Sequence, residues 1–156
     1  AQISVLGGDR RRYSWFGYEV CGTDLSYTLA DSSVDISEPE ETVLSFIETS
    51  ADQLNLLEKL KALYDSQILH CERPSKLFNA YGKNWGTDIV TIIKDNSECL
   101  GYLVRNHTKE KISEIVINGF SKEVFNACIR ESPNKRVRVS VGPHQVGLMR
   151  ILGKVR

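Results

Sequence analysis

The sequence of 156 residues lacks several features that would assign a class of protein at once. No run approaches the roughly 18 to 20 consecutive apolar residues that a membrane-spanning helix needs. The N-terminus has no basic segment followed by an apolar signal core. We therefore expect a soluble, intracellular protein of the cytoplasm or nucleus, with no membrane partner.

Patterns typical of metal, cofactor and catalytic sites are also missing. The four cysteines lie far apart and form no Cys-x-x-Cys pair, which favours reduced structural thiols over a zinc site. Gly7-Gly8 lacks the remaining glycines of a dinucleotide-binding loop. His70 and Cys71 are neighbours on an expected strand, so they would point to opposite faces rather than form a base and a nucleophile. We therefore expect that the protein is not an enzyme and that it binds no cofactor or metal.

The apolar content of the chain is sufficient for one hydrophobic core. Hydrophobic residues make up 41% of the sequence, and the length suits one ordinary domain better than two. We expect residues 1–156 to form a single α+β domain, ending in a basic tail at residues 142–156.

The net charge is zero, but the charges are segregated along the chain. Residues 31–72 carry ten acidic and two basic side chains, whereas residues 101–156 carry four acidic and eleven basic ones. Such a distribution permits a basic face for phosphate groups, although the two regions could equally pair with one another inside the domain.

Residues 85–105 predict a buried β-hairpin. Ile89, Val90, Ile92 and Ile93 form a β-branched run, residues 95–97 form a turn cluster, and the apolar pattern resumes at residue 100. Further strands are expected within residues 1–6, 15–29, 66–71, 124–129 and 136–141. Helical spacing predicts two helices or one broken helix within residues 39–64 and a short helix over residues 109–117. Residues 75–85 are expected to form a polar loop.

This order of elements resembles a HIRAN domain over about residues 17–141. The matching segments are residues 69–74 with Glu-Arg-Pro, residues 79–84 with Asn-Ala-Tyr, the apolar strand at residues 88–93, and Gly-Tyr-Leu-Val-Arg at residues 101–105. The resemblance implies a small β-barrel of six or so strands, related to OB and SH3-like folds, with two or three helices. It also implies binding of single-stranded DNA, since family members hold DNA, in the best-understood cases at a free 3′ end.

The resemblance places Tyr102 and Arg105 at such a site, with Arg73, Tyr81 and Lys83 nearby. A tyrosine ring can stack on any base, and arginine can grip phosphate oxygens with two hydrogen bonds. The sequence departs from the family at Gly82, which occupies the position of an aspartate. We therefore expect binding of single strands or DNA ends without strict 3′-end selectivity.

The strand at residues 136–141 alternates between basic and apolar residues, which predicts one wet, basic face. Arg136 and Arg138 on that face are expected to contact phosphates. The favoured function is thus a non-enzymatic nucleic-acid-binding module that targets a larger protein or complex. The alternative is a protein-interaction domain, such as an inhibitor, an immunity-type protein or a complex subunit, which would dock its acidic helices at residues 39–64 on a basic partner.

Overall fold

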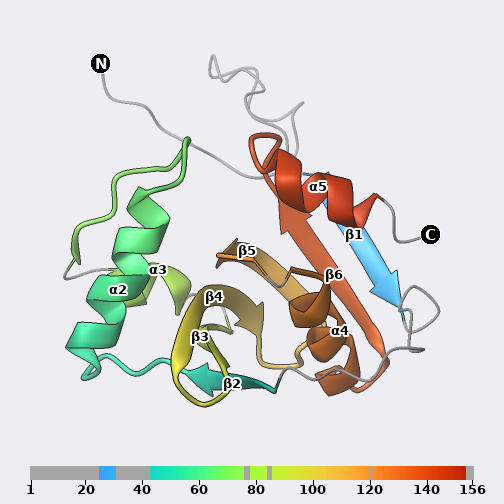
Figure 1. Ribbon diagram of the computed structural model, residues 1–156, viewed down its shortest axis with the longest axis horizontal. Coiled ribbons are helices and arrows are strands. Elements are labelled where there is room, and N and C mark those ends of the chain that lie inside the picture. Colours follow the sequence, from blue (N-terminus) through green and yellow to red (C-terminus); the bar gives the residue numbers. More distant parts are fainter. Residues whose placement is uncertain (1–24, 31–42, 76–77, 84–85, 120, 154–156) are drawn as a thin grey trace, which may run out of the picture.

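A mixed β-sheet forms the centre of the molecule in the computed structural model (Figure 1). The structure describes residues 25–30, 43–75, 78–83, 86–119 and 121–153. The strands are β1 (Leu25–Ala30), β2 (Leu44–Glu48), β3 (Thr87–Lys94), β4 (Glu98–Asn106), β5 (Lys111–Ile117) and β6 (Arg136–Val141). Their order in the sheet is β1-β6-β5-β4-β3-β2. Neighbouring strands are antiparallel except β5 and β6, which are parallel.

The prediction of an α+β fold is confirmed, and the sheet has the expected six strands. In the described part of the chain the sheet is open, with β1 and β2 at its two edges, so barrel closure is not shown. No helix within these residues is long and apolar enough to cross a membrane.

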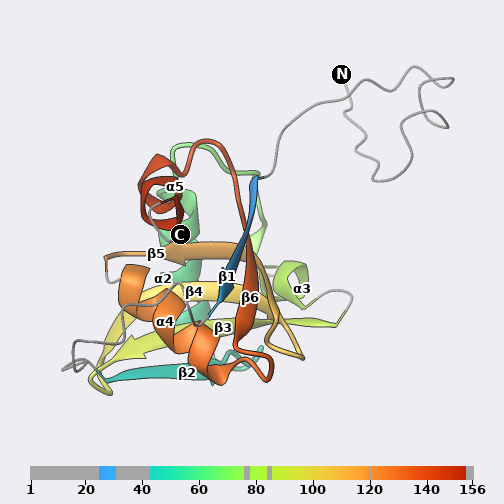
Figure 2. The same ribbon diagram turned by 90° about the vertical axis from the view of Figure 1, so that its right-hand side faces the viewer.

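Helices cover both faces of the sheet (Figures 1 and 2). The described residues form α2 (Leu54–Asp65), α3 (Phe78–Gly82), α4 (Ser121–Glu131) and α5 (Val146–Leu152). Residues of α4 and α5 share a hydrophobic cluster with Val137, Val139 and Val141 on one face of the sheet. Residues of α2 and α3 share a second cluster with Tyr102 and Val104 on the opposite face.

The predicted hairpin is confirmed as β3 and β4 joined by a tight turn. Asp95 and Asn96 both have positive φ, 48° and 59°, a backbone state that asparagine and aspartate tolerate in hairpin turns. The pairing then shifts between Ile92 and Ile93, which pair with Gly101 and Cys99 and leave Leu100 as an extra residue. The shift reverses the alternation, so that Leu100 faces α4 whereas Tyr102 faces α2. Gly101 has a φ of 147°, and a Cβ atom there would lie 2.1 Å from the carbonyl oxygen of Val116.

The helix predicted over residues 109–117 is wrong, because these residues include β5. The register of β5 against β4 shifts between Val104 and Arg105, which leaves Ser113 as an extra residue. As a result, Ile112 and Ile115 face one cluster and Val116 the other. A β-bulge therefore gave this strand an apolar spacing that resembles one face of a helix.

Three other predicted elements are also wrong. The strand predicted at residues 124–129 is part of α4, where Val124, Phe125, Cys128 and Ile129 form the buried face. The helix predicted from residue 39 is replaced over residues 44–48 by β2. Residues 66–71 form no strand, and Ile68 is 97% exposed.

Other predicted segments contain an additional helix, or are described by the structure only in part or not at all. The loop predicted at residues 75–85 contains α3, and the basic tail contains α5. The strand predicted within residues 15–29 is described only as β1, and the strand at residues 1–6 lies outside the described residues. The strand at residues 136–141 is confirmed with its predicted bounds.

Candidate nucleic-acid interface

A polar groove lies on the face of the sheet that bears α2, at the end formed by β1, β6 and β5. The groove has a volume of about 770 Å³ and is open to solvent. Its lining residues are Thr28, Asn106, Glu110, Lys111, Asn134, Arg136 and Arg138. It therefore includes two of the residues predicted from sequence to contact phosphates.

The alternation of β6 accounts for the position of the two arginines. Val137, Val139 and Val141 are buried against α4 and α5, so Arg136 and Arg138 project from the opposite face and are exposed. Arg138 is in register with Thr28 of β1 and, on its other side, with Lys111 of β5. The predicted wet, basic face of this strand is thus present.

The groove carries a local excess of positive charge. Lys111, Arg136 and Arg138 form no ion pair with any residue that the structure describes. Glu110 supplies the one carboxylate of the groove, and it accepts hydrogen bonds from Asn134 and from Thr108 at 3.3 Å. The acidic side chain is held by neutral groups, so the three cations remain available to an anion.

Tyr102 lies in the core, not on a surface. Its ring is 0% exposed and packs edge-on against Phe78 with the ring centroids 5.7 Å apart. Its hydroxyl donates a hydrogen bond of 2.5 Å to Oε1 of Glu114. Burial, followed by the charge of Glu114, raises the pKa of Tyr102. The predicted stacking of this ring on a base would require the core to open.

Arg105 points away from Tyr102, because residues three apart on a regular strand face opposite sides of the sheet. It is 7% exposed, and its guanidinium group lies 2.7 Å from Oε2 of Glu131 on α4 and 5.3 Å from the ring centre of Phe46. Tyr102 and Arg105 therefore cannot line one common site, which contradicts the arrangement expected from the sequence. The two-residue period of the strand could have revealed this.

Arg73 joins the network on the α2 face. Its guanidinium group makes two hydrogen bonds to Glu114, at 2.8 and 2.6 Å, and lies 4.0 Å from the ring centre of Tyr64. Burial opposes the charge of Arg73, but the hydrogen bonds and charge of Glu114 outweigh it, so the pKa of Arg73 is raised. The structure thus brings Arg73 and Tyr102 together through Glu114, as part of the packing between residues 66–75 and the sheet.

The remaining predicted residues lie around α3. Tyr81 belongs to this helix, but its side chain is outside the described part, and Lys83 is exposed just after the helix. Gly82 is buried, and a Cβ atom there would lie 2.0 Å from Cγ1 of Ile89. Packing against the sheet therefore excludes the family's aspartate at this position. Asp88 lies on the following strand, 2.8 Å from Nε2 of His107.

The cysteines of the described chain are free thiols. They are Cys71, Cys99 and Cys128. Burial raises the pKa of Cys128 to about 12 and also raises that of Cys99, so both thiols stay protonated at neutral pH. Within the same residues, no three metal-binding side chains come together. Cys21 lies outside the described residues.

A substitution of Arg105 tests its structural position. We expect Arg105→Met to lower the free energy of unfolding by about 1 to 2 kcal/mol, because it removes the hydrogen-bonded pair with Glu131 but keeps the apolar part of the side chain. Urea unfolding would measure this change. Binding of single-stranded DNA should stay unchanged, and a loss of binding by the folded variant would contradict the structural assignment.

A scan against models of protein families found no match to this chain, and a search of curated proteins also found none.

Proposed function

We propose that the chain is a non-enzymatic nucleic-acid-binding module that holds single-stranded DNA or a DNA end and targets a larger protein or complex. One observation supports this proposal above all. Lys111, Arg136 and Arg138 lie exposed in one groove without an acidic partner among the described residues. Like charges on neighbouring strand positions destabilise a sheet, so an anionic ligand best explains the arrangement.

The chemistry of the groove favours phosphodiesters as that ligand. Arginine binds phosphate oxygens with two parallel hydrogen bonds, and a lysine adds a point charge. Because Tyr102 is buried, we expect phosphate contacts to supply most of the affinity and to give little base preference. We include a HIRAN-type barrel in the proposal because of the matching sequence segments. The proposed DNA-binding surface is the groove instead of a surface formed by Tyr102 and Arg105.

The salt dependence of binding tests the proposal. We expect a labelled oligothymidylate of about 12 nucleotides to bind with a slope of log affinity against log salt of about −1.4 to −2, from two or three phosphates neutralised by the three cations. The double variant Arg136→Gln/Arg138→Gln should bind about 30- to 100-fold more weakly at about 50 mM salt, with a slope nearer −0.7. Fluorescence anisotropy at several salt concentrations would measure both quantities.

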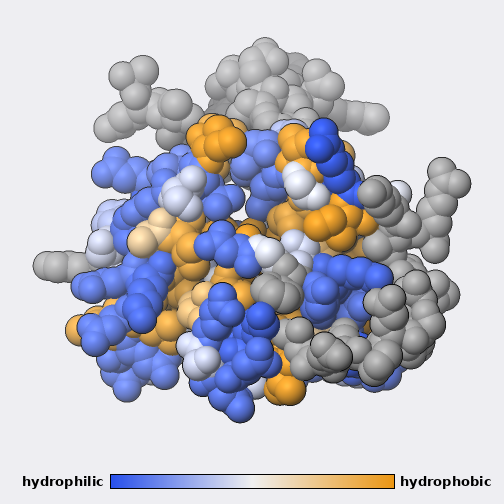
Figure 3. Space-filling view, in the orientation of Figure 1, coloured by the Kyte–Doolittle hydropathy of each residue, from blue (hydrophilic) through white to orange (hydrophobic). Residues whose placement is uncertain are grey.

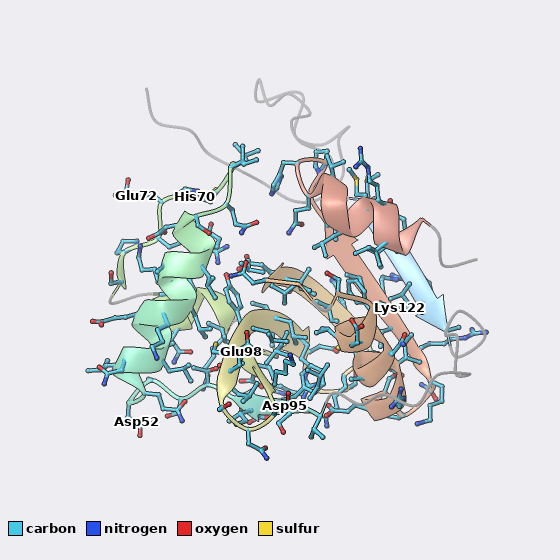
Figure 4. The ribbon with its side chains drawn as sticks, viewed as in Figure 1. Asp52, His70, Glu72, Asp95, Glu98 and Lys122 are labelled. Atoms are coloured by element: carbon cyan, nitrogen blue, oxygen red, sulfur yellow. The ribbon has the colours of Figure 1, made fainter. Side chains whose placement is uncertain are left out.

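A charge-matched variant provides the control. Lys59→Gln/Lys122→Gln removes the same charge from α2 and α4, where both side chains are exposed. Lys122, labelled in Figure 4, lies on the helix that covers the face of the sheet opposite the groove. Equal losses in the two double variants would refute the groove as the site. No binding by the wild type even at low salt would refute the function.

The alternative as a protein-interaction domain has less structural support than the sequence suggested. Of residues 39–64, the structure describes residues 43–64, which contain β2 and most of α2. Glu48 and Asp52 precede α2, and within α2 Glu58 and Asp65 are matched in number by Lys59 and Lys61. Exposed apolar side chains at Ile68 and Leu69 are the feature that still favours a protein partner. Figure 3 shows hydrophobic side chains at several places on this face of the molecule, among hydrophilic ones. A pull-down beside the DNA measurement would separate the two functions.

A further inference from the structure

The cations of the groove are arranged at two levels along β6. At one level, Arg138 and Lys111 are register partners on neighbouring strands, which lie about 4.8 Å apart. At the other level, Arg136 lies two residues before Arg138 on the same face, and therefore about 6 to 7 Å along the strand. The groove thus offers two positions for an anion, the first shared by two cations.

Resting on the function proposed above, we propose that the groove holds two successive phosphates of one extended strand running along β6. One phosphate lies between Arg138 and Lys111, and the next lies at Arg136. Thr28 is the register partner of Arg138 on β1, so its hydroxyl can donate to the first phosphate.

The spacing of the two positions selects the class of ligand. Successive phosphates of an extended single strand are separated by a distance similar to two residues along a β-strand. The two phosphorus atoms of a pyrophosphate or a nucleoside diphosphate lie much closer together and would leave one position empty. The ligand class is therefore an oligonucleotide rather than a nucleoside diphosphate.

Glu110 strengthens this selection. Its carboxylate lines the groove and is held by Asn134 and Thr108 instead of pairing with the cations. A ligand with several negative charges close together would concentrate them near this carboxylate, whereas an extended strand distributes its charges along the groove. We expect Glu110→Gln to relax the discrimination against nucleoside diphosphates.

Oligonucleotides with neutralised phosphates test the two positions directly. Two oligothymidylates of about 12 nucleotides would each keep two charged phosphates, with methylphosphonates at all other linkages. One has its charges on adjacent phosphates, and the other has them separated by several neutral linkages. We expect the adjacent pair to bind about tenfold more tightly, because only that ligand can fill both positions.

Substitution of a cation at one of the two positions, beside a control substitution on the opposite face, completes the experiment. Arg136→Gln should abolish the preference for adjacent charges, whereas the exposed Lys122→Gln on the opposite face should preserve it. Equal binding of the two modified strands by the wild type, with normal binding of the fully charged strand, would overturn the two-phosphate arrangement alone. Failure of the fully charged strand to bind would instead overturn the proposed function.

Discussion

Replacing Tyr102 by alanine should lower the free energy of unfolding by about 3 to 5 kcal/mol. The side chain is 0% exposed and packs in the cluster between the sheet, α2 and α3, so its loss leaves a cavity beside Phe78. Domains of this size are stabilised by only about 5 to 15 kcal/mol, so the variant should be close to unfolding at physiological temperature. Urea or thermal unfolding would measure the effect.

The matched variant Tyr102→Phe retains the ring and removes the hydroxyl that donates to Glu114. Glu114 keeps its two hydrogen bonds from Arg73, so we expect a loss of only about 1 to 2 kcal/mol. A Tyr102→Ala protein that unfolds like the wild type but binds DNA more weakly would contradict the buried position. That outcome would restore the surface site expected from the sequence resemblance.

Replacing Gly101 by alanine should cost about 2 to 5 kcal/mol. The φ of 147° is strained for any residue with a Cβ atom, and the new methyl group would meet the carbonyl oxygen of Val116 at 2.1 Å. Backbone on a neighbouring strand cannot move aside as a flexible side chain can. Equilibrium unfolding in urea would quantify the loss.

Gly119→Ala isolates the contribution of the close contact. Gly119 also has a positive φ, 74°, but a Cβ atom there would meet nothing within 4 Å. We expect this variant to lose only about 1 to 2 kcal/mol, from backbone conformation alone. Similar losses in the two variants would show that the contact between β4 and β5 relaxes without cost.

The hairpin of β3 and β4 was predictable because its local signals agree. The β-branched run from Ile89 to Ile93 favours a strand, and the left-handed conformations of Asp95 and Asn96 suit a tight turn. The alternating arginines and valines of β6 were equally clear. In β6 the period of two residues is uninterrupted, whereas the hairpin prediction depended on residue types and the turn rather than on a period.

The secondary-structure predictions were wrong where a bulge interrupted the two-residue alternation of a strand, or where a short apolar run fitted both a strand and a helix. Ser113 shifts the alternation of β5, so Ile112, Ile115 and Val116 acquire helical spacing while lying on two faces of a sheet. In α4, the pairs Val124-Phe125 and Cys128-Ile129 form one helical face, but a short apolar run of this kind also fits a strand.

The candidate site was predictable only in part. Arg136 and Arg138 could be found because both lie on one strand. Lys111 could not be grouped with them, because the parallel pairing of β5 with β6 is a tertiary contact that no local pattern encodes. Glu114 was missed for the same reason, although it holds both Arg73 and Tyr102.

The position of β1 has a kinetic consequence. This strand pairs only with β6 in the described sheet, and the pairing of Leu25 with Val141 joins the first described residue to the last strand. The meander from β3 to β5 can form from contacts between strands that are close in sequence, whereas β1 must wait for β6 and pay the entropy of closing a long loop. We therefore expect the groove, which takes residues from β1, β5 and β6, to assemble last during folding.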